Sequence, residues 1–308
     1  MEGFLPLEWC LFWLLLSLPF MVWGALRLRK MFQEKPELKV RVAIGGAFIF
    51  VLSSLKLPSV AGSSSHPTGT GLSTIISGPA ITTILASVVL LFQALLLAHG
   101  GLTTLGANIF SMGVVGPFIA FGVYRAMSGV GVKRKITVFT TAFVADIATY
   151  VMTSLQLALA FPDHGSVINA FLAFLTIFAL SQIPLAIVEG LLIVLFFDYL
   201  AANRPDIIGE TRQRKGPRPI VYAAVAEVAA VLIFVALFAN QSMNMSGTDD
   251  AAKQLAQKLA PGYSPWAQSV FSPDPSMQAL LFAMQTMIGL AVLMAALHYG
   301  RKGAELDP

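Results

Sequence analysis

Long apolar runs alternate with short polar segments along most of this chain. A helix needs ~20 predominantly apolar residues to cross the hydrocarbon core of a membrane. Runs of about this length are expected at residues 7–26, 40–58, 79–98, 105–124, 136–161, 167–200, 220–239 and 277–298. A soluble protein can bury one such helix, but not eight. The pattern therefore predicts an all-α polytopic membrane protein.

Composition supports this class. Of the 308 residues, 56% are hydrophobic and only 12% are charged, against roughly 25% charged in an average soluble domain. The first apolar run follows acidic residues and has no small-residue cleavage site, so we interpret it as a retained helix. The single cysteine, Cys10, excludes an internal disulfide and a cysteine-cluster metal site. The net charge of +4 fits basic cytoplasmic loops and requires no nucleic-acid partner.

Basic residues predict the orientation, because cytoplasmic loops are enriched in Lys and Arg. They gather in the first loop, near residues 130 and 215, and in the C-terminal tail. These segments are therefore expected in the cytoplasm of a multi-pass cell-membrane protein, with the N-terminus outside and the C-terminus cytoplasmic.

This orientation requires an odd number of crossings between the outer loop at 59–71 and the loop near 130, yet only two spans are obvious there. We infer a short half-helix at 71–78, broken at Gly78-Pro79, because proline cannot continue a helix. The chain then has nine membrane segments.

Three of the four histidines fall one in each of three expected outer loops. His66 lies in the loop 59–70, His99 in 99–108 and His164 in 162–166. Neutral imidazole is the commonest metal ligand, so convergence of these loops would form a metal site. The alternative is that each histidine is an ordinary loop residue or a helix-end cap.

Motifs for nucleotide hydrolysis, zinc proteolysis, serine hydrolysis and dinucleotide binding are missing from the sequence. We therefore expect a carrier or channel component that does not hydrolyse ATP by itself and is not an enzyme. Among the few intramembrane acids, Asp146 and Glu189 are candidates for a proton path. A self-sufficient proton-coupled metal carrier thus stays open, as does the simpler interpretation of carboxylates capped by a neighbouring helix.

Several strings resemble a known family. MEGFLP, HPTGTG, FQALLLAHGGLTTLGAN, FSMGVVGPF and QIPLAIVEGL are similar to the CbiM family, the cobalt-type substrate-binding (S) component of energy-coupling-factor ABC transporters. This resemblance covers residues 1–209. Residues 210–308 resemble the small CbiN subunit, whose two helices flank an outer loop, and a polar linker at 203–218 joins the two modules. The resemblance implies an S-component bundle of six core helices plus one N-terminal helix, followed by a two-helix module.

The resemblance also implies a function. The chain would be the metal-specificity component of an ATP-driven importer that captures Co(II) from outside for cobalamin synthesis, without a bound organic cofactor. Its partners would be a transmembrane coupling protein and a pair of cytosolic ABC ATPases, within membrane lipid. A Ni(II) importer component of the same type is the alternative, because nitrogen sites bind both ions with similar affinity.

The metal ligands implied by the resemblance are the free N-terminal amine, a histidine at the second position and the histidine of HPTGTG. They correspond here to the amine of Met1 and to His66. Residue 2 is Glu2, whereas the family begins MHI before MEGF. A natural start three residues upstream is therefore expected to supply the second histidine; the alternative is a site that is built differently.

Other positions match the family less directly. His99, Gln93 and Asn108 are expected to support the ligands through hydrogen bonds, or simply to cap helix ends. Ala43 and Ala47, one helical turn apart, match a face that docks on the coupling protein, or serve ordinary helix packing. In the outer loop at 240–276, the segment 262–266 (GYSPW) is suited either to docking on the first module or to anchoring at the membrane surface.

Overall fold

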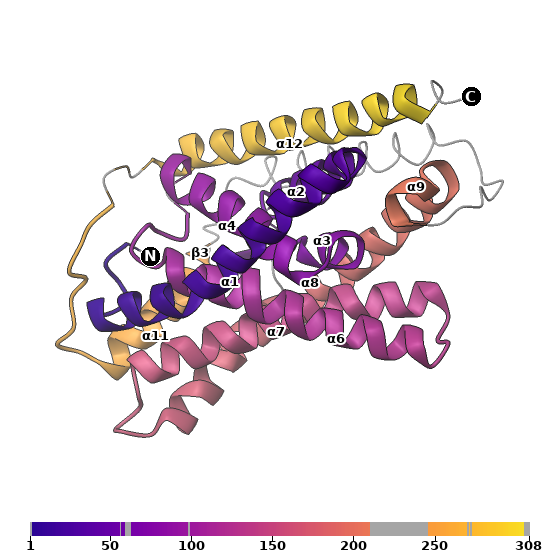
Figure 1. The fold of residues 1–308 in the computed structure, drawn as a ribbon. Helices are drawn as coiled ribbons and strands as arrows, with labels where there is room; N and C mark the ends of the chain where they lie inside the picture. Colours follow the sequence, from indigo (N-terminus) through magenta and orange to yellow (C-terminus); the bar gives the residue numbers. More distant parts are fainter. Residues whose placement is uncertain are drawn as a thin grey trace.

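The computed structural model describes residues 2–55, 57–58, 63–97, 99–209, 246–269, 271 and 273–304. Within these ranges the chain is almost entirely helical (Figure 1), as predicted. Met1, the expected span at 220–239 and most of the expected linker at 203–218 lie outside the described residues.

The helices follow one another with short connections. They are α1 (Leu7–Glu34), η1 (Pro36–Leu38), α2 (Lys39–Leu52), α3 (Thr70–Ser77), α4 (Pro79–Leu96), α5 (Leu105–Asn108), η2 (Ile109–Val115), α6 (Gly116–Gly129), α7 (Arg134–Ala160), α8 (Val167–Asn203), α9 (Pro205–Ile208), α11 (Thr248–Leu259) and α12 (Pro275–Ala304). Three very short strands, β1 (Leu57–Pro58), β2 (Ser63–Ser65) and β3 (Ser246–Gly247), form one small sheet. The central strand β2 pairs antiparallel with β1 and parallel with β3.

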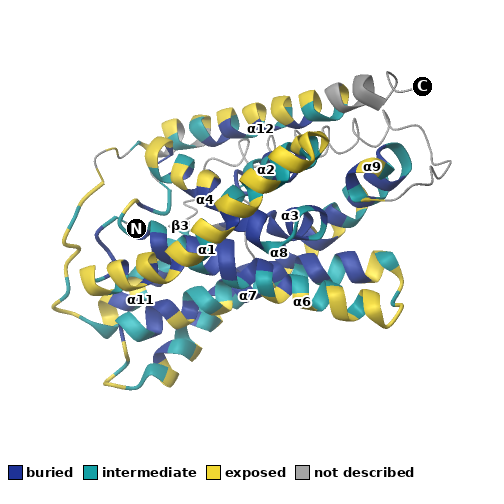
Figure 2. Ribbon diagram, in the orientation of Figure 1, coloured by how far each residue is buried: buried dark blue, intermediate teal, exposed yellow. Residues whose placement is uncertain are grey.

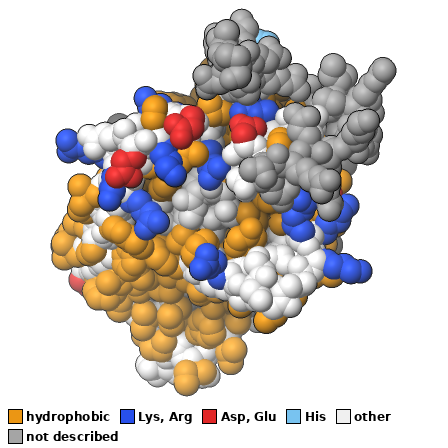
Figure 3. All heavy atoms as spheres, turned by 45° about the vertical axis from the view of Figure 1, so that its right-hand side comes forward, with side chains coloured by type: hydrophobic (Ala, Val, Ile, Leu, Met, Phe, Trp, Pro, Cys, Tyr) orange, Lys and Arg blue, Asp and Glu red, His pale blue; other side chains and the backbone are white. Residues whose placement is uncertain are grey.

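Six of the described helical segments are long and apolar enough to cross a membrane. They are Leu7–Glu34, Pro79–Leu96, Leu105–Gly129, Arg134–Ala160, Val167–Asn203 and Leu280–His298. Their outward faces carry large apolar side chains, such as Leu15, Leu195 and Met287, each more than 60% exposed. Figure 2 shows exposed residues along α1 and α12, and Figure 3 shows a broad area of hydrophobic side chains on one face. Soluble monomers rarely expose apolar patches larger than a few hundred Å², so these faces belong in lipid.

The second predicted span is shorter than expected. Helix α2 ends at Leu52, and residues 57–58 belong to β1. The hydroxyls of Ser53 and Ser54 donate to the carbonyls of Phe50 and Val51, a local alternative to continuing the helix. The prediction that this helix runs to residue 58 is therefore wrong.

The half-helix predicted at 71–78 is confirmed as α3. It ends at Gly78, whose φ of +83° suits glycine, and Pro79 opens α4 in the first helical position. Helix α3 packs against α2 and α7 inside the bundle.

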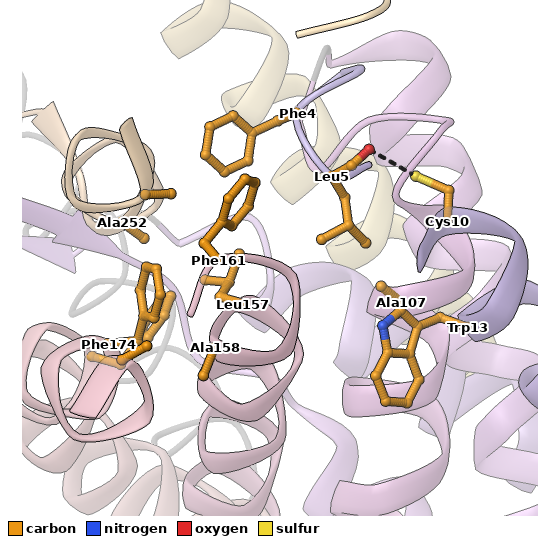
Figure 4. Packing of buried hydrophobic residues seen from close by; sticks show 13 residues of the cluster. Phe4, Leu5, Cys10, Trp13, Ala107, Leu157, Ala158, Phe161, Phe174 and Ala252 are labelled. Carbon is orange, nitrogen blue, oxygen red and sulfur yellow. Dashed lines mark hydrogen bonds between the residues drawn. The ribbon is translucent and has the colours of Figure 1, made fainter. Parts of the chain in front are cut away.

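One apolar cluster joins segments that are far apart in the sequence. Phe4 precedes α1, Phe161 follows α7, and Ala252 belongs to α11 (Figure 4). The rings of Phe4 and Phe161 lie 5.3 Å apart between centroids. Helix α11 also packs on α8, while α12 lies along α2. The C-terminal segment, residues 246–304, is thus docked on the helices of the first 209 residues.

Candidate metal site

The loop that carries His66 connects β2 to α3, and it is hydrogen-bonded to Glu189 of α8. Both carboxylate oxygens of Glu189 accept hydrogen bonds: Oε2 from the Thr68 amide at 2.7 Å, and Oε1 from the Gly69 amide at 2.9 Å. The Thr68 hydroxyl donates to Oε1 at 3.2 Å. Glu189 is fully buried, so these charge-assisted bonds form in a medium where they are strong.

Gly69 fits this arrangement for a steric reason. Its φ is +70°, and a Cβ at this position would lie 2.9 Å from the Cα of Ile49. Only glycine therefore lets the loop turn so closely over α2 before α3 begins.

His66 and His99 meet although they are 33 residues apart. Their Nε2 atoms lie 3.1 Å from one another, and their ring centroids 5.1 Å. Two nitrogens bound to one metal ion at roughly 2.0–2.1 Å lie about 2.9 Å apart at a right angle and about 3.3 Å apart at the tetrahedral angle. The two Nε2 atoms are thus at hydrogen-bond distance, and their separation also lies between the two values expected for ligands on a single ion.

The tautomer of His66 follows from its neighbour. Its Nδ1 lies 3.0 Å from the carbonyl oxygen of Pro67, which can only accept, so Nδ1 carries the proton. In the neutral ring Nε2 then presents a lone pair toward His99. The backbone carbonyl of His66 in turn accepts a hydrogen bond from the Tyr150 hydroxyl at 3.4 Å.

Both imidazoles line a cavity of about 220 Å³ at the end of the bundle where the N-terminal segment and α11 lie. Its walls come from the His66 and His99 loops, α4, α5, η2, α7, α11 and α12. Within the described residues, no group of three or more His, Cys, Asp or Glu side chains is close enough to hold a metal ion. The two imidazoles therefore supply part of a ligand set, and the expected amine ligand of Met1 lies outside the described residues.

Gln93 is fully buried in the wall of this cavity. Its amide nitrogen donates to the carbonyl and hydroxyl of Ser53, at 3.2 and 3.0 Å. Its Oε1 is buried and has no hydrogen-bond partner among the described residues. An orphaned buried oxygen in a polar cavity is an acceptor that a cation or its bound water can satisfy.

Asn108 also lines the cavity, at the point where α5 passes into the π-helical segment η2. Such wide turns occur mostly as short insertions in α-helices, frequently at functional sites. The insertion aims Ser111 and Met112 into the same cavity. The expected span at 105–124 is thus present, but as a helix with an irregular middle that continues to Gly129.

The N-terminal segment is fixed beside the cavity from two sides. The Glu2 carboxylate accepts from the amides of Leu102 and Thr103, at 2.6 and 2.9 Å, in the loop that follows His99. From the other side, the Trp266 indole donates to the Leu5 carbonyl at 2.8 Å and the Trp266 amide to the Gly3 carbonyl at 3.1 Å.

Tyr263 reinforces the same contact. Its hydroxyl donates to the Gly3 carbonyl at 3.4 Å, and its ring packs against Phe161. Burial raises the pKa of the Tyr263 hydroxyl, which keeps it protonated as a donor. The expectation that the segment 262–266 docks on the first module is confirmed.

Other candidates lie elsewhere. His164 is fully exposed, contacts Asp163 at 3.7 Å and does not line the cavity, so the three histidine loops converge only in part.

Asp146 is buried in α7, and neither carboxylate oxygen has a hydrogen-bond partner among the described residues. On α2, Ala47 is packed in an apolar cluster, as ordinary packing predicts, whereas Ala43 is half-buried.

Sequence reasoning missed several residues of the cavity wall. Tyr150, Met112, Asp249 and Gln278 lie in segments that were identified only as helices or as an outer loop. The adjacent pair Asp249-Asp250 was the one available signal, since acids are scarce in this chain.

The helical fold, its lipid-facing surfaces and the polar cavity at one end define the chain as a multi-pass membrane transport protein. It belongs to the CbiM family: residues 1–207 match the family model "Cobalt uptake substrate-specific transmembrane region". Residues 220–306 match the family model of the cobalt transport protein component CbiN.

Individual relatives agree with this assignment. The chain is 57% identical over 201 residues to a cobalt transport protein CbiM of Anoxybacillus flavithermus, and the match covers 65% of this chain and 80% of the relative. It is 52% identical over 225 residues to a cobalt transport protein CbiM of Desulforamulus reducens, with 71% and 88% covered. These names confirm the predicted class, a transport protein rather than an enzyme.

Solved structures are similar as well. The crystal structure of a truncated transition metal transporter has 27% sequence identity and a TM-score of 0.56, and the match covers 65% of this chain and 96% of that one. A second transition metal transporter has 26% identity and a TM-score of 0.55, with 65% and 90% covered.

Proposed function

We propose that this chain captures Co(II) from outside the cell in the cavity around His66 and His99, as the specificity component of an ATP-driven importer. The observation that carries the proposal is the 3.1 Å separation of the two Nε2 atoms inside a polar cavity. Imidazole nitrogens suit Co(II) and Ni(II), and a buried amide oxygen at Gln93 adds a further acceptor. In this proposal the free N-terminal amine is a further metal ligand, because Glu2 and Gly3 are hydrogen-bonded to the loop that follows His99.

Energy for transport comes from partners in this proposal. A membrane-embedded coupling protein and a pair of cytosolic ATPases would drive the cycle, because the sequence lacks a nucleotide-binding motif. The half-buried Ala43 is a proposed contact with the coupling protein. The imported cobalt would serve cobalamin synthesis, and the resemblance to cobalt transporters favours cobalt over nickel.

The first prediction concerns the two histidines. In separate variants, His66→Ala and His99→Ala should each lower cobalt affinity more than ~100-fold, since even residues that only support a ligand contribute 10–100-fold. Cobalt bound by the purified full chain and uptake of radioactive cobalt by cells with the complete transport system provide the measurements.

His164→Ala is the matched control, because that imidazole is exposed in a loop at the same end of the molecule and lies outside the cavity. It should bind and import cobalt like the wild type. Normal cobalt binding by His66→Ala would overturn the site. Uptake that collapses with an uncoupler yet persists without the ATPases would instead favour a proton-coupled carrier. Competition between cobalt and nickel in the same assay decides the preferred ion.

A further inference from the structure

The C-terminal segment contributes directly to the wall of the metal cavity. The ring of Phe282 on α12 packs edge-on against His99, with centroids 5.4 Å apart. Gln285 lies beside Gln93 and donates to the carbonyl of Phe50 at 2.8 Å. These two residues pack against His99 and Gln93, while the wall itself includes Gln278 of α12 and, from α11, Asp249 among others. The cavity is therefore built from both parts of the chain.

Asp249 is held in place by its neighbours in the sequence. Gly247 belongs to β3, which pairs in parallel with β2, the strand that leads directly to His66. Thr248 is buried, and its hydroxyl is bonded to that of Ser181 on α8 at 3.2 Å. Asp249 follows in the first turn of α11 and is half-buried. Its position thus depends on the same small sheet that positions the His66 loop.

The two neighbouring acids differ in their contacts. Asp250 accepts hydrogen bonds from the Gly247 amide and the Lys253 ammonium, both at 3.1 Å. Within the described part of the chain, Asp249 makes no hydrogen bond or ion pair, and it lines the cavity together with Tyr150. Its carboxylate is therefore available to a ligand in the cavity.

A second observation identifies the kind of ligand. Gln93 belongs to the wall of the same cavity, and its fully buried Oε1 has no hydrogen-bond partner among the described residues. A carboxylate, an amide oxygen and imidazole nitrogens around one space are acceptors, and a cation is what they share. The Lys253 ammonium, which also lines the cavity, is paired with Asp250.

We propose that Asp249 receives the hydrated divalent cation as it enters the cavity and passes it to His66 and His99. This inference rests on the proposed function. Among the described residues, no three His, Cys, Asp or Glu side chains are close enough to bind one ion together. Asp249 and the two histidines would therefore bind the ion one after the other. The cavity of about 220 Å³ has room for an ion with part of its water shell, because one water needs only ~10–15 Å³.

The order of the two steps follows from ligand chemistry. A carboxylate oxygen attracts the hydrated ion by charge and can bind it through retained water. Imidazole nitrogens then replace water, because Co(II) binds nitrogen donors well. A charged residue in a cleft raises the local cation concentration and the rate of association.

The rate of cobalt binding tests this role. Stopped-flow mixing of Co(II) with the purified full chain follows the visible absorption of the bound ion. Asp249→Asn should slow binding by about tenfold, while the amount bound at saturating cobalt stays that of the wild type. Asp249→Glu, which retains the carboxylate, should recover most of the rate.

Asp163→Asn is the matched control, because it removes one negative charge from the loop that carries the exposed His164 and lies outside the cavity wall. It should leave the rate unchanged. A wild-type rate for Asp249→Asn, or equal slowing by Asp163→Asn, would overturn the inference. Cobalt binding by His66→Ala separates the two proposals. If Asp249→Asn binds cobalt at the wild-type rate but His66→Ala no longer binds it, the proposed function stands and only the role of Asp249 fails.

Discussion

At the scale of single residues, an acid within the helix bundle holds the loop that carries His66. Glu189 accepts two backbone amides and one hydroxyl from Thr68 and Gly69, two and three residues beyond His66. Sequence reasoning left Glu189 open between a proton path and a capped carboxylate. Its hydrogen bonds agree with the second interpretation, and they connect α8 to the His66 loop of the cavity.

We predict that Glu189→Gln lowers cobalt affinity about tenfold, within the range observed for residues that position a ligand. The two amides donate to different carboxylate oxygens. Glutamine replaces one of these oxygens by an NH2 group, so in the same geometry one buried N–H loses its acceptor at a cost of ~1–3 kcal/mol. Cobalt titration and thermal unfolding of the purified chain measure the two effects.

Asp146→Asn is the comparison for this variant. Asp146 is equally buried but has no hydrogen-bond partner among the described residues, so its substitution removes no hydrogen bond from the His66 loop and should lower cobalt affinity less than Glu189→Gln does. An equal loss in both variants would show that the hydrogen bonds of Glu189 are not what positions the loop.

At the scale of elements, the N-terminal segment and the C-terminal segment form one contact. Gly3 has a φ of +61°, and a Cβ on this residue would lie 2.2 Å from the backbone nitrogen of Ala267. The two segments therefore approach as closely as glycine allows. Trp266 and Tyr263 then close the contact with hydrogen bonds.

Gly3→Ala should separate the two segments, because the added Cβ meets backbone and the left-handed conformation costs alanine about 1–2 kcal/mol. We expect lower thermal stability, faster proteolysis in residues 260–269 and weaker cobalt binding. Gly262→Ala is the control, since no atom lies within 4 Å of the position that its added Cβ would occupy. Unchanged cobalt binding by Gly3→Ala would mean that the site does not depend on the N-terminal segment.

At the scale of the whole molecule, the two ends of the bundle differ in chemistry. The cavity, the N-terminal segment and α11 gather at one end (Figure 1). Several salt bridges of basic residues lie away from the cavity: Arg134 and Lys135 pair with Asp198, and Arg204 pairs with Asp206. Figure 3 shows Lys and Arg together with Asp and Glu on one part of the surface, next to the apolar area. Cytoplasmic loops are rich in Lys and Arg, so we propose that the cavity end faces outward.

Topology reporters test this orientation. A reporter near residue 130 should be cytoplasmic, and reporters near 164 and 262 should be extracytoplasmic. Because 164 and 262 belong to different parts of the chain, their agreement also tests the docking of the C-terminal segment. A cytoplasmic result at 164 would reverse the cavity and exclude capture from outside.

The sequence by itself determined the class and most of the spans, and it indicated His66 as a candidate metal ligand. A helix in lipid must be long and apolar. The length of each apolar run in the sequence shows this directly for α1, α4, α7 and α8. The break at Gly78-Pro79 was predictable for the same reason, because proline acts on its own turn.

Only the tertiary structure decided which polar residues meet. His66 joins His99 and not His164, and Asp249 reaches the cavity from a helix more than 180 residues later in the chain. Such contacts depend on how helices pack and how loops close, and run lengths carry no information about either. The apolar pattern positions segments in the membrane, whereas the site is made where their polar ends converge.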